Sequence, residues 1–122
     1  PEIELLRDSL VELDIGGNII ANAHGDLDWL GDLTELTKLN VYFNNFHYNG
    51  VPPALSSLTK LEILDISYTL FFGNLDGSIF SGMTNLNYLE IGGNSFDSSV
   101  PSEIASLPNL KGFYAEDAHL TG

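Results

Sequence analysis

The sequence predicts an α/β repeat solenoid, a right-handed coil in which short parallel strands form one concave sheet and irregular or short helical segments lie opposite. Two observations predict this fold class. Five segments share one pattern of apolar positions, and they begin at Leu10, Leu36, Leu61, Leu86 and Leu110. Successive starting residues are 26, 25, 25 and 24 positions apart, and self-similarity at such a period is typical of repeat arrays.

Each segment places apolar residues at alternate positions, which is the spacing of a half-buried strand. The segments read LVELDIGGNII, LTKLNVYFNNF, LEILDISYTLF, LNYLEIGGNSF and LKGFYAEDAHL. We therefore expect one short strand per repeat, near residues 12–15, 38–41, 63–66, 88–91 and 112–115. The long connections leave room for a full crossover between strands, so the strands should be parallel.

A polar position follows the strand in most segments. The residues there are Asn18, Asn44, Thr69, Asn94 and Ala118. A buried asparagine can satisfy backbone groups where the chain turns away, and stacked copies would form a ladder. Thr69 can partly substitute in that role, whereas Ala118 cannot. This L-x-x-L-x-L-x-x-N-x-L pattern resembles the leucine-rich repeat family over nearly the whole chain, and the resemblance implies a horseshoe segment of about five repeats.

The remainder of the fourth repeat indicates a subclass. The residues after its asparagine include Phe96, Val100, Pro101, Ile104 and Leu107. Their spacing resembles the plant-type repeats of receptor-like proteins and polygalacturonase inhibitors, which implies one solenoid over residues 1–122. We expect a segment of a longer array, because Arg7 occupies the place of an apolar residue in later repeats and the fifth repeat stops at Gly122.

The chain is strongly acidic. It has 17 Asp and Glu residues against Arg7, Lys38, Lys60 and Lys111, which gives a formal net charge of −13. Such a charge repels nucleic acid and anionic membranes and favours a basic protein or peptide partner, although solubility alone is the alternative. No apolar run approaches the about 20 residues that cross a bilayer, so we expect no membrane insertion.

The compartment stays open at this point. The family resemblance implies an extracellular or cell-surface protein. The sequence, however, has no cysteine and no Asn-x-Ser/Thr glycosylation acceptor, and both observations weaken that assignment.

Outward side chains of neighbouring strands should align in columns about 4.8 Å apart on the concave face. The four columns read Glu12-Lys38-Ile63-Tyr88-Gly112, Asp14-Asn40-Asp65-Glu90-Tyr114, Gly16-Tyr42-Ser67-Gly92-Glu116 and Gly17-Phe43-Tyr68-Gly93-Asp117. Exposed aromatic rings among carboxylates suit partner recognition, and such rings also stabilise sheets by cross-strand pairing. The candidate partner-binding residues are Tyr42, Phe43, Asp65, Tyr68, Tyr88, Glu90 and Tyr114.

Catalysis finds little support in the sequence. It contains no G-x-S-x-G elbow, no phosphate-binding loop and no H-E-x-x-H motif. Asp65 and Glu90 on an open sheet would lack the apolar shielding that an acid–base pair requires, so we expect neither an enzyme nor a cofactor. A lesser metal-binding hypothesis rests on His24, Asp26 and Asp28, which lie close together in HGDLDWLGD. A solvated acidic loop is the simpler explanation of that stretch.

Three functions remain open, because a fold alone does not separate them. The first is a non-catalytic scaffold that binds a basic protein or peptide on an acidic, tyrosine-rich concave face. The second is an extracellular adhesion or glycan-binding module in which tyrosines stack on sugar rings. The third is a structural part of a larger assembly.

Overall fold

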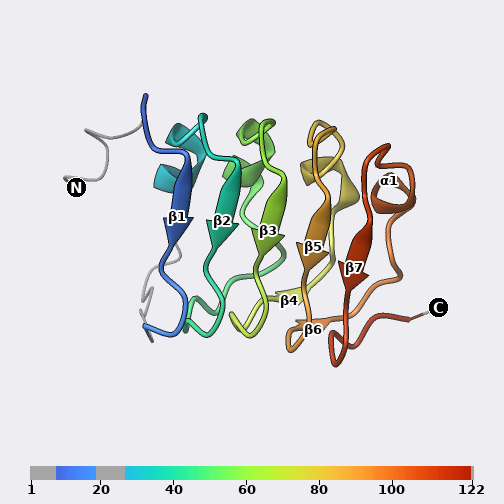
Figure 1. Ribbon diagram of the computed structural model, residues 1–122. Coiled ribbons are helices and arrows are strands. Elements are labelled where there is room, and N and C mark those ends of the chain that lie inside the picture. Colours follow the sequence, from blue (N-terminus) through green and yellow to red (C-terminus); the bar gives the residue numbers. More distant parts are fainter. Residues whose placement is uncertain (1–7, 19–26, 122) are drawn as a thin grey trace.

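Five short strands form one parallel sheet in the order β1-β2-β3-β5-β7 (Figure 1). The computed structural model describes residues 8–18 and 27–121. The strand bounds are Glu12–Asp14 for β1, Lys38–Asn40 for β2, Ile63–Asp65 for β3, Tyr88–Glu90 for β5 and Gly112–Tyr114 for β7. Each strand lies within its predicted range, so the predicted solenoid with a parallel sheet is confirmed.

The strands pair in the predicted register. Glu12 lies opposite Lys38, and Asp14 lies opposite Asn40. The later strands continue both columns, through Ile63, Tyr88 and Gly112 in the first and through Asp65, Glu90 and Tyr114 in the second. The same position of every repeat therefore lies in one row across the sheet.

The connections carry short helical segments behind the strands (Figure 1). Their bounds are Asp28–Asp32 for η2, Pro53–Ser57 for η3, Gly77–Ile79 for η4 and Ser102–Ala105 for α1. Pro52 and Pro101 immediately precede η3 and α1 in extended conformations, where a fixed φ and a missing N–H cost nothing. Asp76 takes that place before η4, and its side chain accepts a hydrogen bond from the Ser78 N–H at 3.0 Å.

A second, smaller sheet joins the connections that follow β3 and β5. It consists of β4 (Phe72–Gly73) and β6 (Ser95–Phe96), which pair in parallel. Single bridges join Asn49 to Phe72 and Ser99 to Thr121. The repeat pattern does not predict this sheet, because each of its strands has only two residues.

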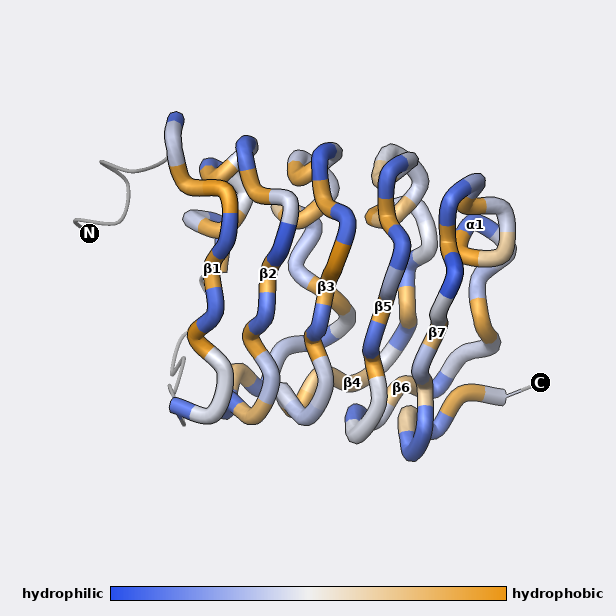
Figure 2. The backbone as a smooth tube through the Cα atoms, in the orientation of Figure 1, coloured by the Kyte–Doolittle hydropathy of each residue, from blue (hydrophilic) through white to orange (hydrophobic). Residues whose placement is uncertain are grey.

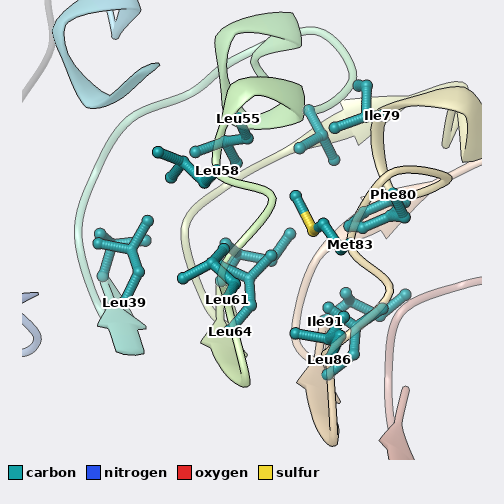
Figure 3. Packing of buried hydrophobic residues seen from close by; sticks show 14 of the residues in the cluster. Leu39, Leu55, Leu58, Leu61, Leu64, Ile79, Phe80, Met83, Leu86 and Ile91 are labelled. Carbon is teal, nitrogen blue, oxygen red and sulfur yellow. The ribbon is translucent and has the colours of Figure 1, made fainter. Parts of the chain in front are cut away.

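One continuous apolar core fills the space between the main sheet and the helical segments. Hydrophobic and hydrophilic residues alternate along β1 and β2 in Figure 2, and Figure 3 shows leucines of the sheet side packed against Leu55, Ile79 and Met83 of the connections. Val41 and Ile91, which follow β2 and β5, are 2% and 0% exposed. The alternate apolar positions of each repeat therefore point inward as predicted.

The asparagine ladder is confirmed, and Asn94 is its best-connected member. Its Nδ2 donates to the carbonyl oxygens of Ile66 and Ile91, each at 2.9 Å. Its Oδ1 accepts from the backbone N–H groups of Thr69 and Phe71, each at 3.1 Å. Thr69 partly replaces asparagine as predicted, because its Oγ1 donates to the Ile66 carbonyl oxygen at 2.8 Å.

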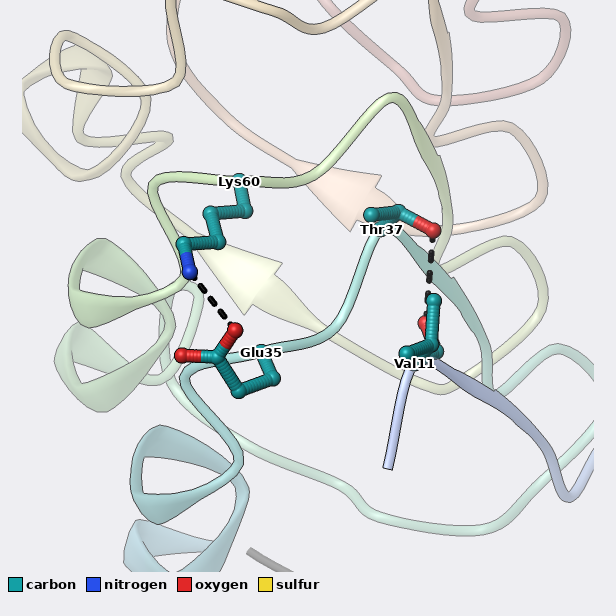
Figure 4. Close-up of polar contacts among 4 residues, drawn as sticks. All are labelled: Val11, Glu35, Thr37 and Lys60. Carbon is teal, nitrogen blue, oxygen red and sulfur yellow. Dashed lines mark hydrogen bonds and ion pairs between the residues drawn. The ribbon is translucent and has the colours of Figure 1, made fainter. Parts of the chain in front are cut away.

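The ion pair between Lys60 and Glu35 contributes little to this fold. Lys60 and Glu35 form a pair at 2.6 Å across two repeats (Figure 4), with side chains that are 55% and 40% exposed. A pair this exposed contributes at most about 1 kcal/mol. None of the helices in residues 8–18 and 27–121 has the length and apolar character needed to cross a bilayer.

Candidate recognition surface

The seven candidate residues lie on or directly after four neighbouring strands of the concave sheet, and we call them the recognition surface. They are Tyr42, Phe43, Asp65, Tyr68, Tyr88, Glu90 and Tyr114. Phe43 and Tyr114 are each 54% exposed, and Tyr68 and Tyr88 are each 44% exposed. Several large exposed rings on one face are more informative than a single exposed apolar residue, and core packing does not explain them.

Three of the rings contact one another, and we call them the aromatic cluster. Phe43 and Tyr68 are stacked, with ring centroids 4.6 Å apart and planes 9° from parallel. Tyr42 meets Phe43 edge-on at a centroid distance of 5.9 Å. Both geometries are favourable for aromatic pairs. Tyr88 and Tyr114 form a separate group around Gly112, where an added Cβ would lie 2.7 Å from Tyr88 Cδ1 and 2.9 Å from Tyr114 Cε2.

Glycines of neighbouring repeats make room for these rings. An added Cβ at Gly16 would overlap the ring of Tyr42, and one at Gly93 would overlap the ring of Tyr68. The Tyr68 ring therefore lies between Phe43 of the preceding repeat and Gly93 of the following one. The rings are held by their surroundings and present fixed edges and hydroxyl groups.

The backbone beneath Phe43 and Tyr68 is in the left-handed region, with φ of 51° and 53°. Gly17 and Gly93, at the same position of the first and fourth repeats, have φ of 71° and 66°. Glycine adopts this conformation freely, whereas a bulky residue there costs about 1–2 kcal/mol. Two consecutive repeats thus place an exposed aromatic where glycine would be relaxed, and such strain often marks a functional site.

Replacing Phe43 with glycine should therefore cost less stability than replacing it with alanine. Both changes remove the stacked ring, which contributes about 0.5–1.5 kcal/mol, but only glycine also relieves the left-handed backbone. We expect the free energy of unfolding of the glycine variant to exceed that of the alanine variant by about 1 kcal/mol. Urea denaturation followed by circular dichroism measures both, and an alanine variant as stable as the glycine variant would contradict the left-handed assignment.

Two carboxylates stand side by side next to the aromatic rings. Asp65 lies directly opposite Glu90 on the neighbouring strand, and Asp65 Oδ1 accepts hydrogen bonds from the Ser67 N–H at 2.9 Å and from Ser67 Oγ at 2.6 Å. Partial burial, and secondarily the charge of Asp65, raises the pKa of Glu90. A cation placed beside Glu90 would relieve this unfavourable interaction.

Replacing Glu90 with glutamine should stabilise the fold at neutral pH. Because the folded-state pKa of Glu90 is raised, its ionisation weakens folding above that pKa, whereas below the unfolded pKa the group is protonated in both states and carries no penalty. The Tm of the variant should exceed that of the wild type at pH 7, and the difference should vanish below about pH 4. Paired thermal melts at the two pH values measure it. An equal difference at both would show that the effect is not ionisation.

The surface contains two hollows that share Tyr68 as a wall. The apolar hollow has a volume of about 500 Å³ and is lined by Gly17, Phe43, Asn44, Asn45, Tyr68 and Leu70. The acidic hollow has a volume of about 280 Å³ and is lined by Tyr68, Glu90, Gly92, Phe113, Tyr114, Ala115 and Glu116. Each is large enough for one side chain of a partner.

The candidates predicted from the sequence did not include Leu70 and Glu116, whose side chains border these hollows. Leu70 is 49% exposed, and Glu116 lines the acidic hollow. The position that corresponds to Leu70 holds Ile19, Asn45, Ser95 and His119 in the other repeats, so the repeat pattern gave no distinguishing signal for Leu70.

The metal-binding hypothesis falls mostly on residues that the structure does not describe. His24 and Asp26 lie outside residues 8–18 and 27–121, whereas Asp28 begins η2. Within those two ranges, no group of three or more His, Asp and Glu side chains is placed to hold a metal ion.

A solenoid of parallel-strand repeats closed by a buried asparagine ladder is the architecture of leucine-rich repeat proteins. The family model described as "Leucine rich repeat" matches residues 59–120, and the chain belongs to this family. Receptor-like protein 39 of Arabidopsis thaliana is 34% identical over 92 residues, which cover 75% of this chain and 10% of that protein. This chain thus spans about a tenth of the length of the curated relatives it matches.

Solved structures show the same fold. The leucine-rich repeat ectodomain of the receptor kinase SOBIR1 from Arabidopsis thaliana superposes with a TM-score of 0.78 at 29% identity, covering 97% of this chain and 62% of that one. The ectodomain of the Arabidopsis receptor kinase HAESA, solved in complex with an N-terminally extended IDA peptide hormone, gives a TM-score of 0.78 at 24% identity and covers 91% and 18%. The predicted plant-type family membership is confirmed.

Proposed function

We propose that the chain is a non-catalytic recognition segment that binds a basic peptide or protein on its recognition surface, and that residues 1–122 act as one solenoid unit. One observation carries the proposal: the stacked and exposed rings of Phe43 and Tyr68 stand on strained backbone beside the carboxylates of Asp65 and Glu90. Rigid aromatic anchors supply contact area at low entropic cost, and the carboxylates favour a cationic partner.

The family adds support of a general kind. Its relatives include plant receptor-like proteins, and the HAESA ectodomain, which has the same fold, is in complex with a peptide hormone. At 24% identity that likeness extends to the fold alone. The choice of a basic partner therefore rests on the charges of this chain, whose net value is −13.

Glycan binding on the ring of Tyr68 is less well supported by the geometry than peptide binding. A sugar ring stacks on an open aromatic face, but Tyr68 is stacked on Phe43 on one side and lies against Gly93 on the other. Its exposed parts are the ring edge and the hydroxyl group, which suit insertion between side chains of a peptide.

A pull-down with two baits tests the proposal. The wild-type chain and a Tyr68→Gly variant are exposed to the same extract at low and at high salt. We expect partners that the wild type retains at low salt, that high salt releases, and that the variant fails to retain. Partners retained equally by both baits would place recognition elsewhere, and no partner at any salt would favour a structural role.

A further inference from the structure

The apolar hollow joins an aromatic pair to an exposed aliphatic side chain. Phe43, Tyr68 and Leu70 line it, and Leu70 is 49% exposed. Tyr68 stacks on Phe43 from the following repeat. One apolar side chain from a partner would pack against Phe43 and Leu70 in this hollow.

The acidic hollow lies on the other side of Tyr68 and has the opposite chemistry. Glu90 and Glu116 line it, Asp65 stands opposite Glu90, and the ring of Tyr114 closes one wall. Among the described basic residues, Lys38, Lys60 and Lys111, none lines this hollow. A lysine or arginine side chain would bring the compensating charge and could lie along the aromatic walls.

The two hollows are offset across the sheet. The apolar hollow spans the first three repeats and the acidic hollow spans the last three, so their centres are about two strand spacings, or about 10 Å, apart along the solenoid. The acidic hollow also lies nearer to the strands of the main sheet than the apolar hollow does. An extended peptide advances about 3.3 Å per residue and a polyproline helix about 3.1 Å, so three or four residues span that separation.

We propose that the recognition surface selects a peptide segment in which an aromatic or large aliphatic residue and a Lys or Arg stand three or four positions apart. The apolar residue occupies the apolar hollow beside Phe43 and Leu70, and the basic residue occupies the acidic hollow beside Glu90 and Glu116. Tyr68 separates the two side chains and sets their spacing. This inference rests on the proposed function and adds to it the composition and the spacing of the ligand.

Selection of random dodecapeptides displayed on phage against the wild-type chain tests the spacing. The enriched peptides should share one apolar and one basic residue three or four positions apart, and binding of the enriched peptides should be lost with Tyr68→Gly. Peptides that bind the wild type, fail to bind Tyr68→Gly, and yet share no such spacing would overturn this inference and leave the proposed function standing. Enrichment of no peptide, or binding unaffected by Tyr68→Gly, would overturn both.

A double-mutant cycle assigns each peptide residue to its hollow. Changing the basic residue of an enriched peptide to glutamine should weaken its binding to the wild type at least about tenfold, but should have little effect on binding to a Glu90→Gln, Glu116→Gln variant. Glu103→Gln on α1, behind the sheet, is the matched control and should leave the wild-type response intact. Leu70→Asn, which suits the left-handed backbone at this position and removes the aliphatic wall of the apolar hollow, should remove only the apolar preference. If changing the basic peptide residue to glutamine weakened binding equally for the wild type and for the Glu90→Gln, Glu116→Gln variant, the assignment of that residue to the acidic hollow would be overturned.

Discussion

Replacing Asn94 with alanine should lower the free energy of unfolding by about 3 kcal/mol or more. The side chain is 2% exposed and connects the backbone of two repeats through Ile66, Thr69, Phe71 and Ile91. Alanine would leave buried N–H and carbonyl groups without partners, and each such group costs about 1–3 kcal/mol. Urea denaturation measures the loss.

Asn18→Ala is the matched control for this prediction. Asn18 donates to the carbonyl oxygens of Ile15 at 2.7 Å and Gly16 at 3.2 Å, but these bonds are exposed and water can replace the side chain. The loss should stay below about 1 kcal/mol. Equal losses for both variants would mean that burial does not determine the strength of the ladder.

Replacing Tyr68 with alanine should weaken binding of a partner by about 30-fold or more. Tyr68 lines both hollows and stacks on Phe43, and truncating a central aromatic anchor typically costs more than about 2 kcal/mol. Isothermal titration with the partner recovered by the wild-type bait measures the change in Kd.

Two further variants separate recognition from folding. Tyr68→Gly removes the same ring and also relieves the left-handed backbone, so it should bind as weakly as Tyr68→Ala and be the more stable of the two. Glu12→Ala, on the far strand β1, removes a peripheral charge and should change binding only modestly, mainly through the association rate. A Tyr68→Ala variant that binds at wild-type strength would move the function away from the concave face.

The sequence was sufficient to predict the sheet because its period is nearly constant. With 24 to 26 residues from one repeat to the next, corresponding residues of neighbouring strands lie opposite one another. The columns through Asp65 and Tyr88 therefore followed from counting residues. Alternation then placed Val41 and Ile66 in the core, and the Asn94 ladder followed from the need to satisfy buried carbonyl groups.

The arrangement of the rings could not be predicted in the same way. Which rings touch depends on side-chain torsions and on the space above glycines of other repeats, and no periodic pattern records either. The sequence placed Tyr42, Tyr68 and Tyr88 on one face, but Tyr68 stacks on Phe43 whereas Tyr88 lies with Tyr114 around Gly112. The β4–β6 sheet was missed because two-residue strands leave too short a pattern.

The left-handed position after each strand offers a route for protein engineering. The residues at this position are Gly17, Phe43, Tyr68, Gly93 and Asp117, all with positive φ. The same backbone conformation therefore already accommodates glycine, aromatic residues and an aspartate. Side chains there project outward, and an exchange alters the surface while leaving the interior unchanged. A combinatorial library randomised at these five residues alone would vary one continuous strip of the concave face. Binders to unrelated targets could then be selected from a scaffold whose apolar core is unchanged, with a cost of about 1–2 kcal/mol for each glycine that is replaced by a bulky residue.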